Sequence, residues 1–239
     1  MTAVRAPWRR VSIAAGAAVL AVAPLLVGCS GGDSSSDATP GQLSQRLATA
    51  KQQLDDAASI KFDLSTDDLP DGVTGLQDAS GTGTHDPAFQ GDVSVSAMGG
   101  VDAGVIAVGN DVWAKISFSP TYVPVDPTDL GAPNPATLFD TEDGVTSFLT
   151  STQNLEQGEQ SRDGDLVLTT VKGTLPGEIV QRLIPTADAS ADFDVEYRIT
   201  DDDALHDATM VGPFYGDAGD VTYTMSLTAS DESVDITAP

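Results

Sequence analysis

The segment Val105-Ile106-Ala107-Val108-Gly109-Asn110-Asp111-Val112-Trp113-Ala114-Lys115 decides the fold class. Gly109 and Asn110 separate two short runs that are rich in valine and other apolar residues. In the second run, which continues to Phe118, apolar and polar positions alternate. A period of two on either side of a glycine-containing turn is typical of an antiparallel β-hairpin.

The same period of two recurs along most of the chain. It is found at residues 60–64 and 93–97, and again at residues 166–174, 193–199, 205–211, 221–227 and 234–236. Clusters of Gly, Asp and Pro separate these runs. The sequence therefore predicts a series of strands joined by short turns, which is an antiparallel meander.

Three segments have helical spacing instead. Thr39, Pro40 and Gln42 have the order of a capping box with proline at the first helical position. An apolar stripe with spacings of three and four follows, and it predicts a helix over residues 40–58. Two shorter helical segments are predicted at residues 140–151 and 175–184. An α+β fold is expected.

The charge of the chain limits its partners. It has 36 acidic and 11 basic residues and a net charge of −25. Without residues 1–28, 8 basic residues face the same 36 acidic ones, and the charge becomes −28. Such a polyanion repels phosphate backbones and anionic membrane surfaces over a Debye length of about 8 Å. Nucleic acid is therefore excluded as a partner.

The N-terminus has the order of a secretory signal. Three arginines precede a nearly continuous apolar run from Val11 to Val27. The alternative is a transmembrane helix, but the run has 17 residues, and a span needs about 20. The only cysteine follows directly, in Leu26-Val27-Gly28-Cys29, which resembles the lipobox of bacterial lipoproteins. We therefore expect a signal peptide at residues 1–28, lipidation of Cys29, a flexible tether at residues 29–40 and one domain at residues 41–239.

No set of residues predicts catalysis or metal binding. His85 and His206 lie far apart in turn-like surroundings, and one cysteine cannot form a thiolate metal site. The Asp-rich segments 163–165 and 201–203 lack the spacing of an EF-hand loop and are interpreted as solvated turns. We expect no enzyme activity and no cofactor. An envelope hydrolase remains as an alternative without a convincing site.

The chain as a whole resembles the mycobacterial LppX/LprA/LprF/LprG lipoproteins of actinobacteria, and most closely their LprG-like members. The individual motifs are weak, and their order carries the resemblance. They are Cys29 and residues 59–64, 93–100, 105–115, 135–140, 173–176, 212–215 and 234–239.

The resemblance implies a curved antiparallel half-barrel with helices on its concave face, enclosing a hydrophobic cavity as in periplasmic lipid chaperones of the LolA/LolB type. It also implies a carrier of acylated lipids, glycolipids or lipoglycans, held at the extracytoplasmic face of the cell membrane and working with a membrane lipid transporter. The cavity candidates are Val93, Val95, Phe148, Leu149, Ile179, Leu183, Val195 and Tyr197. The alternative is a structural or adhesive surface lipoprotein with a solid core and no ligand.

Overall fold

The computed structural model describes residues 38–96, 100–116, 119, 121–130 and 132–239. They form one compact unit that begins at the end of the predicted tether. Cys29 and the predicted signal peptide lie outside the described residues. Within the described part of the chain, no helix combines the length and apolar character that crossing a bilayer requires.

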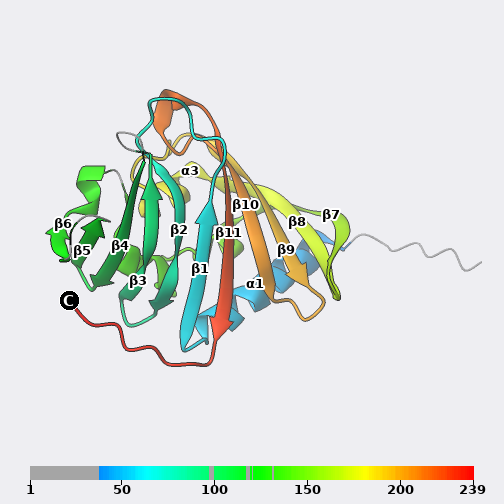
Figure 1. The fold of residues 1–239 in the computed structure, drawn as a ribbon. Helices are drawn as coiled ribbons and strands as arrows, with labels where there is room; N and C mark the ends of the chain where they lie inside the picture. The colour runs from blue at the N-terminus through cyan, green and yellow to red at the C-terminus, as the bar shows by residue number, and fades with distance from the viewer. Residues whose placement is uncertain (1–37, 97–99, 117–118, 120, 131) are drawn as a thin grey trace, which may run out of the picture. The chain divides into compact units, whose positions relative to one another are not determined.

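Eleven strands form one antiparallel sheet in the order β6-β5-β4-β3-β2-β1-β11-β10-β9-β8-β7 (Figure 1). The strands are β1 (Ser59–Ser65), β2 (Leu76–Thr84), β3 (Ala88–Val95), β4 (Val101–Val108), β5 (Asp111–Ile116), β6 (Val123–Val125), β7 (Gln153–Asp163), β8 (Leu166–Pro176), β9 (Asp192–Thr200), β10 (Leu205–Gly212) and β11 (Val221–Ser230). The first and last strands pair at the centre of the sheet, so each half is a meander.

The predicted hairpin is confirmed. β4 and β5 pair antiparallel, with Val105 opposite Ala114 and Val108 opposite Asp111. Gly109 has a φ of 58° in the turn, in the left-handed region that glycine adopts without steric cost. The glycine thus fixes the register of the two strands.

The helices are α1 (Pro40–Asp55), α2 (Ser147–Ser151) and α3 (Gly177–Leu183), with short 3-10 helices η1 (Pro127–Leu130), η2 (Pro135–Phe139) and η3 (Gly216–Ala218). The capping box of α1 is present: the Gln42 N–H donates to Thr39 Oγ1, and the Thr39 N–H donates to Gln42 Oε1. The three main helices are shorter than the sequence predicted. α1 ends before β1 begins, and the first residues predicted for α3 belong to β8.

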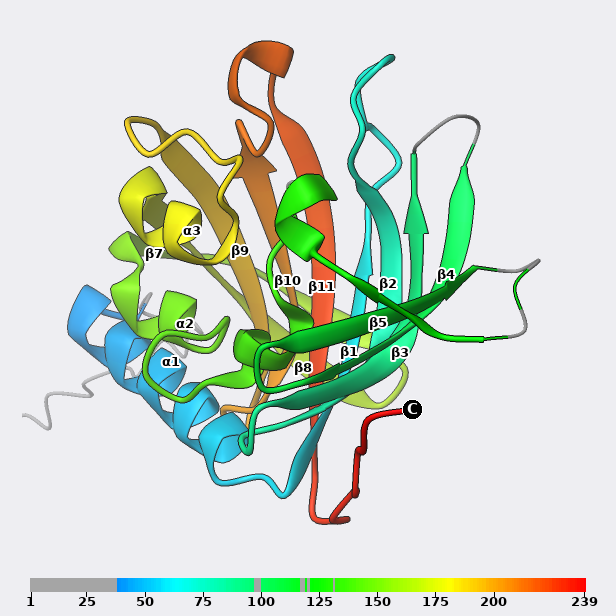
Figure 2. The same cartoon turned by 90° about the vertical axis from the view of Figure 1, so that its left-hand side faces the viewer.

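The sheet curves around its helices, as Figure 2 shows. Alternate residues of every strand point to this concave face, called here the inner face, and the others point to the outer face. α1, α2 and α3 pack on the β7–β11 half of the inner face, and η2 packs on β2, β3 and β4. The structure is therefore an α+β half-barrel with its helices on the concave side, as predicted.

Two features at the margins of the sheet differ from regular strands. The predicted strand at residues 234–236 is wrong: the tail after β11 forms no strand. Its Ile236 is buried on the outer face with Ala88 and Ile106. The edge strand β7 has register shifts between Gln153 and Glu156 and between Gln157 and Gln160. Regular pairing along this edge is therefore interrupted twice.

Candidate functional site

The covered half of the inner face contains six of the predicted cavity residues. Five of them are at most 7% exposed and belong to one continuous core: Phe148, Leu149, Leu183, Val195 and Tyr197. Ile179 is partly buried against the same core. The structure therefore brings α2, α3 and β9 together, and here their side chains pack against one another.

Polar contacts hold α2 over this core. The Thr152 hydroxyl donates to the Phe148 carbonyl oxygen at 2.7 Å, so the Tyr197 hydroxyl donates to Thr152 Oγ1 at 2.9 Å. Burial raises the pKa of Tyr197, and the phenol stays neutral. Just before α2, the Thr146 hydroxyl donates to the Asp55 carboxylate of α1 at 2.9 Å. The segment that carries Phe148 and Leu149 is thus tied to both α1 and the sheet.

A cluster of phenylalanines packs η2 onto the other half. The rings of Phe62 and Phe139 lie 5.8 Å apart between centroids, and those of Phe89 and Phe139 lie 6.2 Å apart. A Cβ added to Gly83 would lie 2.0 Å from the Phe139 ring. Because glycine has no side chain, Phe139 reaches the sheet directly. The sequence patterns did not predict this cluster, although the glycines at alternate positions 81 and 83 of β2 are a visible signal of it.

Beyond η2, part of the inner face is not fully covered. Leu64, Val93, Ala103 and Ile116 stand in one row across β1, β3, β4 and β5, with the buried Ala79 of β2 between Leu64 and Val93. Ile116 is 39% exposed, Val123 of β6 is 51% exposed, and the rest of the row except Ala79 is partly buried. We call Leu64, Val93, Val95, Ala103, Ile116 and Val123 the inner strip. It contains the two remaining predicted residues, Val93 and Val95.

The inner strip is continuous with the covered core. Leu64 and Val93 are partly buried and pack against the main core cluster, to which Phe148, Leu183 and Tyr197 belong. All six strip side chains are aliphatic and offer no hydrogen-bonding group. What the arrangement can do chemically is bind an apolar chain by burial alone, at about 25 cal/mol per Å² of apolar surface.

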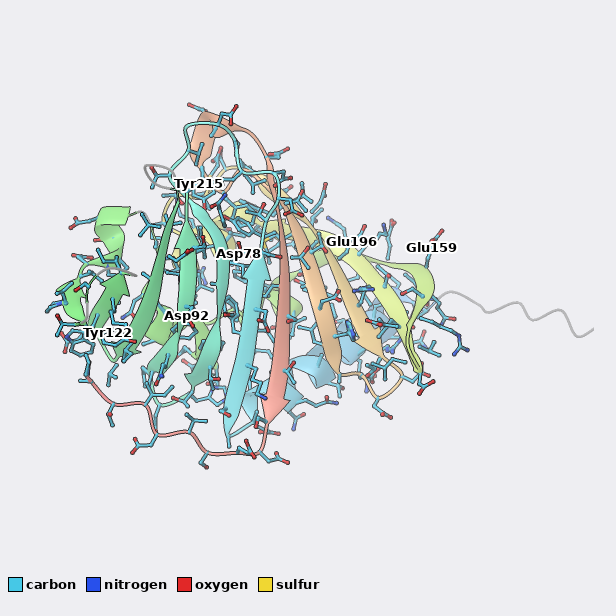
Figure 3. All side chains as sticks on the ribbon, viewed as in Figure 1. Asp78, Asp92, Tyr122, Glu159, Glu196 and Tyr215 are labelled. Atoms are coloured by element: carbon cyan, nitrogen blue, oxygen red, sulfur yellow. The ribbon has the colours of Figure 1, made fainter. Side chains whose placement is uncertain are left out.

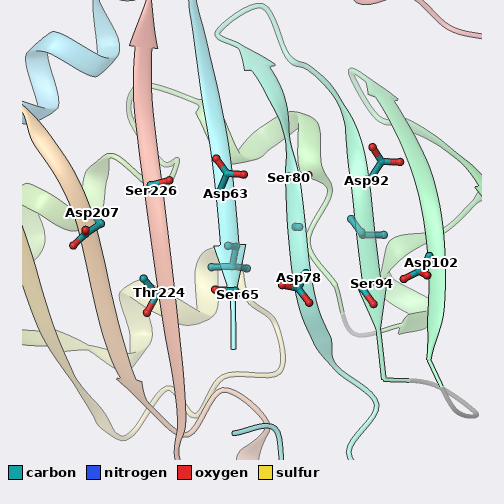
Figure 4. A pocket seen from close by; sticks show the side chains of 13 residues that line it. Asp63, Ser65, Asp78, Ser80, Asp92, Ser94, Asp102, Asp207, Thr224 and Ser226 are labelled. Carbon is teal, nitrogen blue, oxygen red and sulfur yellow. The ribbon is translucent and has the colours of Figure 1, made fainter. Parts of the chain in front are cut away.

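The outer face has a different chemistry. It contains a hollow of about 520 Å³ between β10 and β4, lined mainly by serines, by Thr224 and by the carboxylates of Asp63, Asp78, Asp92, Asp102 and Asp207 (Figures 3 and 4). The register alternates the two residue types: Ser80 lies opposite both Asp63 and Asp92, and Ser94 lies opposite both Asp78 and Asp102. This spacing limits repulsion between carboxylates. Such a surface does not suit an apolar ligand.

Both histidines make structural contacts. The two ring nitrogens of His85 lie 2.7 Å from the Phe139 carbonyl oxygen and 3.2 Å from that of Leu54, which ties η2 to the end of α1. His206 Nδ1 lies 2.8 Å from the Asp207 carboxylate, which also accepts from Arg198. Burial by itself raises the pKa of Asp207, but these hydrogen bonds outweigh it and hold the pKa below its usual value.

The Asp-rich turns at residues 163–165 and 201–203 also make structural contacts. Asp203 accepts from Arg46 of α1 at 2.5 Å, and Asp163 lies 3.4 Å from His206. Across the described ranges, no three Asp, Glu, His or Cys side chains are grouped so that they could hold a metal ion.

Comparison with known proteins gives the context of this fold. The family model of the LppX_LprAFG lipoproteins matches residues 41–236. LprF from Mycobacterium bovis superposes with a TM-score of 0.68 at 15% identity, over 83% of this chain and 97% of that one. The Mycobacterium tuberculosis lipoprotein LppX gives 0.60 at 18% identity, over 83% and 100%. At these identities the two structures support the fold alone. No curated protein sequence matches the chain significantly.

Proposed function

Because the chain belongs to the LppX_LprAFG lipoprotein family, we propose that it is a membrane-anchored carrier that binds the acyl chains of lipids or glycolipids and moves them across the cell envelope. The single observation that carries this proposal is the inner strip. It is an aliphatic surface on the concave face of the sheet, partly uncovered and continuous with a core that short helices roof.

In this proposal an acyl chain binds first along the inner strip. It then extends under α2 and α3 as Phe148, Leu149, Ile179 and Leu183 separate from Val195 and Tyr197 of β9. The helix α2 is short, packs on α1, and is tied at its two ends by hydrogen bonds of Thr146 and Thr152. The ligand buries again the apolar surface that the helices uncover, and this offsets part of the cost of opening.

Loading and unloading need no chemical energy in this mechanism. Moving a methylene group out of water is favourable by about 0.8 kcal/mol in a bilayer and by a similar amount in an apolar protein site. The free energies of the acyl chain in the two environments therefore nearly balance. We propose no turnover chemistry. A membrane lipid transporter is the expected partner, and acyl chains on Cys29 would hold the protein at the extracytoplasmic face of the membrane.

Two substitutions in the inner strip test the proposal. Val93→Thr with Val95→Thr keeps the β-branched shape but places two hydroxyls where acyl chains would bind. Burying each hydroxyl without a partner costs about 1–3 kcal/mol. We expect lipid occupancy, measured by native mass spectrometry after purification in mild detergent, to fall at least tenfold while the free energy of unfolding changes little.

Ser94→Thr is the matched control. It adds a methyl group between the two substituted positions but on the outer face, and it should leave lipid occupancy unchanged. Wild-type protein that carries no lipid and takes up none from vesicles would refute the carrier proposal.

The packing of the covered half favours a second candidate, a structural or adhesive lipoprotein with a solid core. If that core never opens, Leu183→Trp overpacks it and lowers the free energy of unfolding by about 1–3 kcal/mol, with no lipid bound to the wild type. If the core opens for acyl chains, the indole occupies ligand space. Lipid occupancy then falls, and thermal unfolding of the lipid-free protein changes by less than this amount.

A further inference from the structure

Three loops meet at the end of the sheet where β1 finishes and β2 begins, the upper end in Figure 1. They are residues 66–75, 184–191 and 213–220. The Leu76 N–H, at the end of the first loop, donates to the Tyr215 hydroxyl at 3.1 Å, and the Asp188 N–H donates to the Pro213 carbonyl oxygen at 3.1 Å. The loops therefore form one continuous rim.

This rim is acidic throughout. The three loops contain no lysine or arginine, and they carry six aspartates: Asp67, Asp68, Asp71, Asp188, Asp217 and Asp220. All but Asp188 are well exposed. A ligand whose chains enter the inner strip from this end would bring its headgroup next to these carboxylates.

A hollow of about 390 Å³ lies in the first of these loops. Its polar side chains include Asp71, Thr74, Gln77 and Ser96. Ser96 directly follows Val95 of the inner strip, and its hydroxyl donates to the Val73 carbonyl oxygen at 2.7 Å. The hollow therefore lies beside the end of β3 that carries Val95.

The lining of this hollow defines the chemistry that it can accept. The side chains of Asp71, Thr74 and Gln77 form no hydrogen bond with other described residues, so carboxylate, hydroxyl and amide groups remain free for a ligand. The carboxylate only accepts hydrogen bonds, and no basic residue of the rim can neutralise a phosphate or sulfate. Within a Debye length of about 8 Å, the rim repels an anionic group.

We propose that this hollow is a headgroup subsite, and that it selects lipids whose headgroups donate hydroxyl hydrogens and carry no negative charge. This inference rests on the proposed carrier function and adds to it the class of lipid carried. The aliphatic strip supplies affinity for the chains, and the rim supplies discrimination between headgroups.

The test compares two lipids with identical acyl chains, a diacylglycerol and a phosphatidylglycerol. Full-length protein is purified from membranes, stripped of lipid and titrated with each, with occupancy read by native mass spectrometry. We expect the wild type to prefer the diacylglycerol about tenfold at low ionic strength, and the preference to shrink at high ionic strength.

Charge-reversal variants test whether the rim aspartates cause the preference for the uncharged lipid. Asp71→Lys with Asp217→Lys, both at exposed rim positions, should abolish most of the preference. Asp201→Lys with Asp202→Lys changes the net charge equally in the β9–β10 turn, at the opposite end of the sheet. This control should keep the preference.

The outcomes separate the two proposals. Equal binding of both lipids to the wild type, or equal loss of preference in both double variants, overturns the subsite and leaves the carrier function standing. Failure of the wild type to bind either lipid overturns the carrier function and the subsite with it.

Discussion

At Gly83, the absence of a side chain lets the Phe139 ring lie directly on the sheet. The ring belongs to η2, so one glycine determines how closely a roof element approaches β2. His85, two residues later, ties the same 3-10 helix to α1. Gly83 and His85, at the end of β2, thus determine how η2 packs on half of the inner face.

Gly83→Ala tests this close approach. The added Cβ overlaps the Phe139 ring, and overpacking of this kind costs about 1–3 kcal/mol. We expect urea denaturation to show a loss in this range, partly restored when Phe139→Leu is added. Gly41→Ala in α1 meets no atom within 4 Å and should be neutral or slightly stabilising. A Gly83→Ala protein as stable as the wild type would contradict the packing described.

Among the elements, those with strong local signals were predictable from sequence. The β4–β5 hairpin and the start of α1 carry a turn glycine and a capping box, which act within a few residues. The tail was not predictable, because Val234 and Ile236 alternate like a strand but no strand edge is free next to β11, which pairs with β1 and β10. The tail instead buries Ile236 on the outer face, where it packs with Ala88 and Ile106.

The candidate site was likewise predictable from sequence only in part. The predicted cavity residues lie on the inner face or on the helices over it, because alternation and helical spacing report which side of an element is apolar. Residue spacing does not report how much of the inner face the helices cover. Whether Val93 is covered, as Val195 is, depends on where η2 and α2 pack, and long-range contacts such as Thr152 with Tyr197 decide that.

The C-terminal tail should behave as a structural strap. Ile236→Ala removes a buried side chain that packs against Ala88 and Ile106, and we expect a loss of about 2 kcal/mol, the lower end for buried isoleucine. Trp113 packs against the same cluster, so its fluorescence should report the release of the tail. Val234→Ala, at a position 42% exposed, is the control and should change stability by less than about 0.5 kcal/mol.

At the scale of the whole molecule, the N-terminal end of the domain lies at one edge of the sheet. The Ala38 N–H donates to the Gln157 side chain of β7 at 2.7 Å. The described part of the chain therefore begins at the β7 edge, whereas the inner strip ends at β6, the opposite edge.

Replacing Cys29 tests the proposed lipid anchor. Cys29→Ala should leave an unprocessed precursor or release the protein from its normal location, because no thiol remains for acylation. Membrane fractionation with mass measurement of the N-terminus checks this, and Ser30→Ala serves as the neighbouring control. A normally processed Cys29→Ala protein that stays in the membrane fraction would rule out lipidation at this residue.

The interrupted pairing of β7 has a consequence for crowding. Proteins confined to a membrane surface meet one another far more often than proteins in solution, and an exposed strand edge can recruit the matching edge of a neighbour. The two register shifts in β7, with Asn154 at a φ of 53° beside the first, break the regular spacing of donors and acceptors that such recruitment needs. The irregular β7 edge is therefore poorly suited to pairing with a strand of another copy.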